Sequence, residues 1–176
     1  MTSASPSAQT RFQVRFDFGA DSPVIEDAHV VVWVDALADP TADPQAIPGS
    51  TAVVTGGPAA RADIATWVLA LQASLGDRAM VAVVAAGATG ARFAVEDFVA
   101  AGAVIDALAE VGIDYTSPEA AAAAGAWAAL RNAGSHVLSA SVAGQELLAT
   151  GGSLDAARDA WSAAGIRVLR EFGGTL

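Results

Sequence analysis

Two uninterrupted apolar runs constrain the fold of this chain most strongly. They are HVVVWVD at residues 29–35 and AMVAVVAA at residues 79–86. Continuous apolar runs of this length are typical of central strands in a sheet that is covered on both faces. We therefore expect these two segments to lie in the middle of a β-sheet.

Further strand and helix patterns alternate with these runs. RFQVRFDFG at 11–19 alternates apolar and polar residues, which predicts a strand with one buried face. Apolar spacing, Ser caps and terminal glycines predict helices, and short apolar segments predict more strands. The expected helices cover residues 60–76, 96–111, 117–132 and 135–150, and a last one lies between Ser153 and Gly165. The expected additional strands lie at 51–55 and from residue 166 onward.

This alternation predicts one α/β domain over residues 11–176, preceded by a disordered tail over residues 1–10. We expect a three-layer α/β/α sandwich. The hairpin-like spacing of the first strands favours a mixed β-sheet over a wholly parallel one.

Composition excludes several classes of function. The 176 residues are 53% hydrophobic and carry a net charge of −10, which opposes nonspecific binding to nucleic acid or to an anionic membrane. There is no Cys and there are only two His residues, so a bound metal would need oxygen ligands. The sequence shows neither a membrane span nor a signal peptide, so we expect a cytoplasmic protein.

One segment does not fit a helix or a strand. ALADPTADPQAIPGS at 36–50 contains three prolines and has no periodicity, which predicts a loop directly after a central strand. In open α/β sheets, ligands usually bind at the carboxyl ends of such strands. Asp35, which closes the strand, is therefore either a ligand at the mouth of a site or a solvated strand end.

The segment GATGAR at 87–92 lies where a strand is expected to turn into a helix. Its backbone N–H groups and the helix dipole suit an oxyanion, although most Gly-containing turns of this kind bind nothing. Arg92 could hold a phosphate or sulphonate with two hydrogen bonds, or it could be a solvated loop residue.

Glu96 and Asp97 fall in the first turn of the expected helix. Carboxylates are stabilised there by the helix dipole without any further role. They are also the ligand type that Mg²⁺ prefers, together with water and substrate phosphate. The residues themselves leave both interpretations open.

Four segments, taken together, resemble the 2-phosphosulpholactate phosphatase family. They are VRFDFG (14–19), VVVWVDAL (30–37), GATGARFAVEDFVAAGAVIDAL (87–108) and SVAGQELLATGG (141–152), and they occur in the family's order. The most specific part is ATGARFAVEDF at 88–98. The resemblance implies an Mg²⁺-dependent phosphomonoesterase that acts on a small phosphorylated acid.

The resemblance also implies roles for individual residues. Asp35, Arg92, Glu96 and Asp97 would be catalytic, and Asp35 and Glu96 would hold the metal. Phosphate or sulphonate would be bound by a second set, namely Gly87, Thr89, Gly90, Arg92 and Ser141.

The sequence departs from the family pattern at three places. The hydroxyl-rich segment after Asp35 is replaced by ADPTADPQ, an Asn-Gly-Thr motif is replaced by Gly56-Gly57-Pro58, and an expected Arg is Gln145. These losses imply an alternative, a catalytically inactive relative that binds a small anion or a protein partner. The shortened region would also expose apolar surface that a homodimer would cover.

Overall fold

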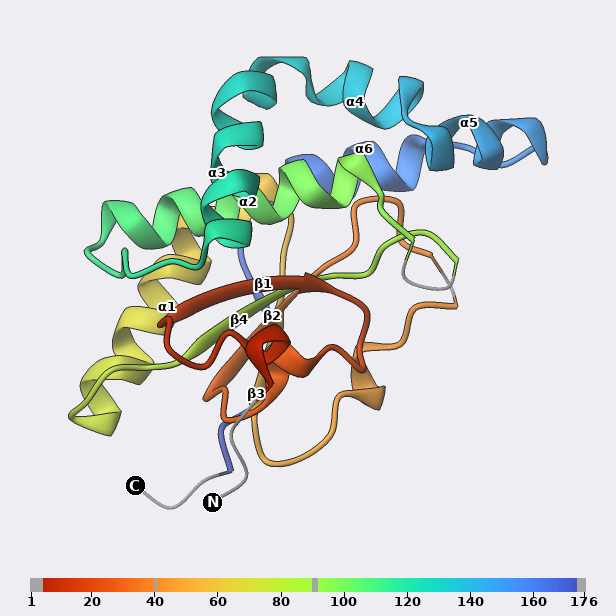
Figure 1. The fold of residues 1–176 in the computed structure, drawn as a ribbon. Helices are drawn as coiled ribbons and strands as arrows, with labels where there is room; N and C mark the ends of the chain where they lie inside the picture. The colour runs from red at the N-terminus through yellow and green to blue at the C-terminus, as the bar shows by residue number, and fades with distance from the viewer. Residues whose placement is uncertain (1–4, 40, 90–91, 174–176) are drawn as a thin grey trace.

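Five strands form one sheet in the order β1-β4-β2-β3-β5 in a computed structural model that describes residues 5–39, 41–89 and 92–173 (Figure 1). The two apolar runs form β2 (Val30–Val34) and β4 (Val81–Ala85), which are neighbours inside the sheet. Every residue of both strands is buried. The expectation of two central strands is therefore confirmed.

The sheet is mixed, as expected, but the expected reason was wrong. β1 (Val14–Phe18), β4, β2 and β3 (Ala52–Thr55) are all parallel. The antiparallel strand is the last one, β5 (Arg167–Arg170), which pairs with β3 at the other edge from β1. The first two strands do not form a hairpin because β4 lies between them. The amino end of β5 consequently lies beside the carboxyl ends of the parallel strands.

Three helices cover one face of the sheet. They are α1 (Arg61–Leu75), α2 (Val95–Glu110) and α3 (Pro118–Leu130), and their apolar residues share one core with Val32, Val54 and Val83. The local signals that predicted these helices are visible as caps. Gly76 ends α1 in the left-handed conformation, and the Ser117 hydroxyl accepts a hydrogen bond at the start of α3.

The opposite face is covered by loops and short 3-10 helices. Trp33 and the neighbouring strand residues of that face pack against η2 (Pro23–Ile25) and against Ile47, which follows η3 (Pro44–Ala46). The α/β class is confirmed; among the described residues, this second covering layer is formed by 3-10 helices and loops where α-helices were expected. The prolines in these connections remove backbone donors and interrupt helices, which accounts for the difference.

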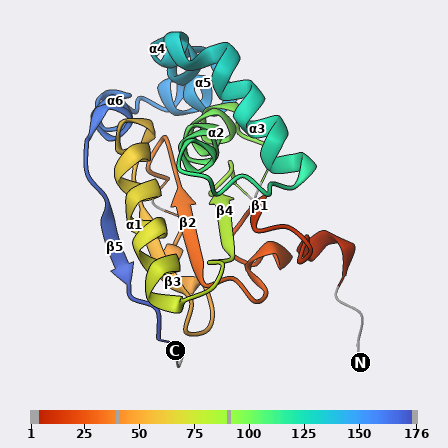
Figure 2. The same cartoon turned by 90° about the vertical axis from the view of Figure 1, so that its left-hand side faces the viewer.

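Three shorter helices lie beyond the carboxyl ends of the parallel strands (Figure 2). They are α4 (Gly134–Ala140), α5 (Val142–Ala149) and α6 (Asp155–Ser162). The single helix expected over 135–150 is broken at Ser141, whose backbone is extended and whose hydroxyl caps α5. A Cβ atom on Gly144 would overlap the carbonyl oxygen of Leu138, so this glycine permits the close approach of the two helices. None of the helices in the described residues is long and apolar enough to cross a bilayer.

Residues 5–10 of the expected disordered tail have a defined structure, while residues 1–4 lie outside the described residues. Ala8 is fully buried at the end of a 3-10 helix, Pro6–Ala8, and the Gln9 side chain bonds to the backbone of Phe16. Arg15, expected on the polar face of β1, is only 1% exposed. Its guanidinium donates to the carbonyl oxygens of Thr10, Phe12, Val24 and Glu26, and burial lowers its pKa. These bonds fix the amino-terminal segment against the sheet.

A glycine pair offers a test of the contact between α2 and α3. A Cβ atom on Gly102 would overlap the carbonyl oxygen of Ala123, whereas a Cβ atom on Gly125 in α3 would meet open space. We expect Gly102→Ala to lower the free energy of unfolding by about 1–3 kcal/mol through overpacking. Gly125→Ala should raise it by up to about 1 kcal/mol, because alanine favours helix. Urea denaturation of both variants checks this, and equal effects would contradict the described packing.

Candidate active site

Three acidic residues line one cavity at the carboxyl edge of the sheet. Asp35 follows β2, and Glu96 and Asp97 lie in the first turn of α2. The cavity has a volume of about 240 Å³. Its other walls come from the loop after Asp35, the turn after β4 and helix α5; the lining residues there are Leu37, Ala38, Asp39, Gly87, Ala88, Thr89, Ala143, Glu146 and Leu147.

Asp97 holds two walls of this cavity together. One carboxylate oxygen accepts the N–H of Ala36 at 2.7 Å, and the other accepts the N–H of Gly87 at 2.8 Å. These two N–H groups belong to the segments that follow β2 and β4. Asp97 is only 3% exposed, so it fixes both segments from inside the protein. This geometry makes it a positioning residue.

The environment disfavours the charged forms of Asp35 and Asp97. Burial raises the pKa of Asp97 to about 7; the hydrogen bond from Ala36 opposes this rise, and the nearby charge of Asp35 adds to it. Burial also raises the pKa of Asp35, whose side chain accepts the N–H of Asp39 at 3.2 Å. A nearby positive charge would favour ionisation of both groups.

Glu96 is the most unusual of the three acids. Its side chain is 1% exposed, and its Oε2 atom is buried without a hydrogen-bond partner among the described residues. An unpartnered buried carboxylate oxygen is costly, and such atoms are normally satisfied by a donor, a water or a cation. The Glu96 Oε2 atom is therefore a candidate ligand for a hydrogen-bond donor or a cation that enters the cavity.

The donor set fits one hard cation that is completed by water and substrate. No three acidic or His side chains in the described part of the chain are clustered into a ready metal site. Mg²⁺, however, is commonly held by one or two carboxylates, with waters and phosphate oxygens completing its shell. Asp35 and Glu96 line the same cavity and supply such a pair.

The expected anion-binding residues are only partly brought together. Thr89 lines the cavity and is exposed, while the N–H of Gly87 is already bonded to Asp97. Arg92 is exposed and donates to Glu146 at 2.7 Å instead of lining the cavity. Ser141 does not line it either, because its hydroxyl caps α5. Gly90 lies outside the described residues.

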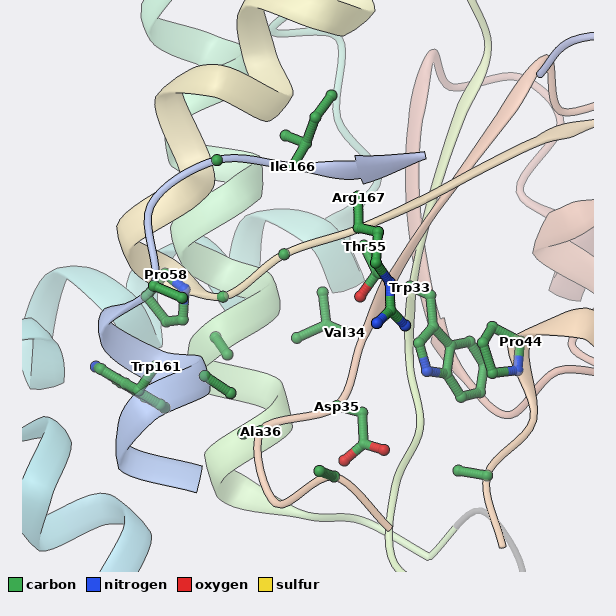
Figure 3. A pocket seen from close by; sticks show the side chains of 18 of the residues that line it. Trp33, Val34, Asp35, Ala36, Pro44, Thr55, Pro58, Trp161, Ile166 and Arg167 are labelled. Atoms are coloured by element: carbon green, nitrogen blue, oxygen red, sulfur yellow. The ribbon is translucent and has the colours of Figure 1, made fainter. Parts of the chain in front are cut away.

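A second, larger cavity of about 620 Å³ is also bordered by Asp35 (Figure 3). It shares Asp35, Ala38 and Asp39 with the smaller cavity. Its remaining walls come from the ends of β2 and β3, from the 36–50 loop and from the segment between α6 and β5; they include Trp33, Pro44, Thr55, Gly56, Trp161 and Arg167. Asp35 thus stands at the junction of two cavities.

The sequence model of one protein family, 2-phosphosulpholactate phosphatase, matches residues 44–159, which is more than half of the chain. The chain belongs to this family. The matched region includes Arg92, Glu96 and Asp97 but begins after Asp35. No curated protein matches the sequence. The family membership inferred from the sequence segments is therefore confirmed.

The places where this 2-phosphosulpholactate phosphatase relative departs from the family pattern have structural roles of their own. In the 36–50 loop, Asp39 accepts two hydrogen bonds from Thr41, and Asp43 caps η3. A Cβ atom on Gly57 would overlap the carbonyl oxygen of Ala160 in α6, so glycine is needed there. The Gln145 side chain donates to the carbonyl of Ser139.

Sequence reasoning missed Glu146, which lines the smaller cavity and pairs with Arg92. It lies 54 positions from Arg92, so only the fold brings the two together. The one available signal was its place in the SVAGQELLATGG segment, directly after Gln145.

Proposed function

We propose that this protein is an Mg²⁺-dependent phosphomonoesterase that hydrolyses a small phosphorylated acid. The observation that carries the proposal is the convergence of Asp35, Glu96 and Asp97 in one cavity, with a buried Glu96 oxygen left without a partner among the described residues. Membership of a phosphatase family supports the same reaction type. The substrate class and the metal are the proposed part.

Each acid would have a separate task. Asp35 and Glu96 would hold the metal, because Asp35 stands at the cavity junction and Glu96 has the unpartnered oxygen. Asp97 would keep the two strand-end segments in place through its bonds to Ala36 and Gly87. When bound, Mg²⁺ would supply the positive charge that stabilises the phosphoryl oxygens during transfer.

Thr89 and Arg92 would contribute to the phosphate side of the cavity. Thr89 lines it directly. Arg92 lies at its rim through the exposed bond to Glu146, whose own side chain lines the cavity. Exposed ion pairs stabilise a protein by less than about 1 kcal/mol, so an incoming phosphate can compete with Glu146 for the guanidinium.

The reaction is tested with purified protein and a panel of phosphorylated hydroxy acids. We expect release of inorganic phosphate from at least one of them with Mg²⁺, and loss of that release when a chelator is added. Equal phosphate release with and without the chelator would show that the reaction does not depend on a metal. If no member of the panel releases phosphate, the proposed phosphatase activity is wrong.

A second candidate is a noncatalytic relative that binds a small anion or a protein partner. This candidate is favoured because two groups expected to bind an oxyanion already have partners within the protein. The Gly87 N–H donates to Asp97, and Arg92 pairs with Glu146. Loss of one oxyanion donor can lower a rate by about 10²–10³. For this candidate, anions should raise the melting temperature by mass action without being turned over. Turnover of any ligand that raises it would refute this candidate.

A further inference from the structure

We infer that Arg167 binds a second acid group of the substrate, a carboxylate or a sulphonate, inside the larger cavity. This inference rests on the proposed function, since it assumes that the phosphate of the same molecule occupies the smaller cavity. Arg167 lies outside the region that matches the family model. It was not among the site residues expected from the sequence.

The antiparallel direction of β5 brings Arg167 to the functional edge of the sheet. Arg167 is the first residue of β5, and it pairs with Thr55, the last residue of β3. Thr55 in turn pairs with Trp33, two residues before Asp35. A parallel last strand would have placed its first residue at the opposite edge.

Strand alternation places Arg167 and Asp35 on the same face of the sheet. Val31 and Trp33 belong to the core on the face away from α1 and α2, and Asp35 continues their alternation. Leu169 packs against the same core, so Arg167, two residues earlier in β5, also faces this way. Figure 3 shows the Arg167 side chain pointing into the larger cavity, toward the side where Trp33 and Asp35 lie.

The guanidinium of Arg167 is available for a ligand. It forms no ion pair and no side-chain hydrogen bond with any described residue, and it is exposed. By contrast, Arg92 pairs with Glu146, and Arg170 donates to the carbonyls of Ile47 and Thr51. Arg167 therefore has its planar fork of donors free, and this fork fits a carboxylate or a sulphonate.

The cavity around Arg167 suits a short organic acid. Trp33, Pro44 and Ile166 provide apolar walls, and Thr55 adds a hydroxyl beside the arginine. Asp35 borders both cavities, so a molecule that spans this junction can present its phosphate ester on one side and its second acid group on the other. Such a molecule is a small phosphorylated acid of the kind already proposed as substrate, and Arg167 is the residue assigned to its second anionic group.

Binding of sulphoacetate, which carries a sulphonate and a carboxylate but no phosphate, tests the subsite without catalysis. By titration calorimetry we expect the wild type to bind it at millimolar concentration or below, and Arg167→Gln to weaken it by about ten- to a hundredfold. Arg158→Gln, which removes an exposed ion pair with Asp155, is the matched control and should leave binding unchanged. No binding to the wild type, or equal binding to Arg167→Gln, would overturn the inference.

Two further measurements separate this inference from the proposed function. Binding of inorganic phosphate should be unchanged in Arg167→Gln, since the phosphate is assigned to the smaller cavity; an equal loss for both ligands would overturn the separate subsite. If the wild type releases no phosphate from any ester but sulphoacetate binding depends on Arg167, the Arg167 subsite is supported and the proposed phosphatase activity is wrong. If phosphate is released and Arg167→Gln leaves the KM for the ester unchanged, the proposed phosphatase activity is supported and the Arg167 subsite is wrong.

Discussion

Replacing Glu96 with glutamine is expected to lower Mg²⁺-dependent phosphate release by about two to three orders of magnitude, the scale seen when one group that stabilises transition-state charge is lost. The glutamine has nearly the same shape but no negative charge for the cation. Because Glu96 is only 1% exposed, bulk solvent does not reach its Oε2 atom, and a bound cation would be the partner that this oxygen lacks. The measurement is initial phosphate release as a function of Mg²⁺ concentration.

Glu110→Gln is the matched control for this variant. Glu110 is at the exposed carboxyl end of the same helix and lines neither cavity. We expect wild-type rates from it. A folded Glu96→Gln protein with the wild-type rate and the wild-type Mg²⁺ dependence would show that Glu96 does not hold the metal.

The second large effect concerns stability and pH, and it comes from Asp97. The pKa of Asp97 rises from 3.8 to about 7 on folding, so between these pH values the folded protein keeps a proton that the unfolded chain releases. This contribution to the free energy of unfolding is fully present below about pH 4 and is lost as pH rises through about 7. Over that interval the loss is on the order of 4 kcal/mol.

Comparison with Asp97→Asn isolates this contribution, because the amide does not titrate. At acid pH the variant should be less stable by about 1–3 kcal/mol, since an amide oxygen accepts only one of the two N–H bonds from Ala36 and Gly87. The difference should shrink or reverse by pH 8. Urea denaturation from pH 4 to pH 8 measures it, with Asp106→Asn on the same helix as control. A constant difference across this range would contradict the raised pKa.

The parts of the fold that local sequence determines could be predicted. The apolar runs fixed β2 and β4 as central strands, and Gly76 and Ser117 marked helix ends. The meeting of Asp35 with the first turn of α2 also followed, because the carboxyl ends of neighbouring parallel strands lie at one edge.

The remaining features depend on contacts between distant segments. Arg15 has the sequence position of a solvent-facing residue, and only the folded loops bring four carbonyl groups to its guanidinium. The pairing of Arg92 with Glu146 depends on where α5 lies, and the position of Arg167 depends on the direction of β5. The break at Ser141 was the exception, because Ser is a common helix cap and its local signal was available.

The position of a bound metal tests the proposed roles of Asp35 and Glu96 directly. Crystals soaked in Mn²⁺ and inorganic phosphate would locate the metal by its anomalous scattering. We predict one Mn²⁺ in the smaller cavity, with Asp35 and Glu96 as its protein ligands and phosphate beside it. Phosphate bound there without metal, or Mn²⁺ only at other acidic residues, would contradict the assignment.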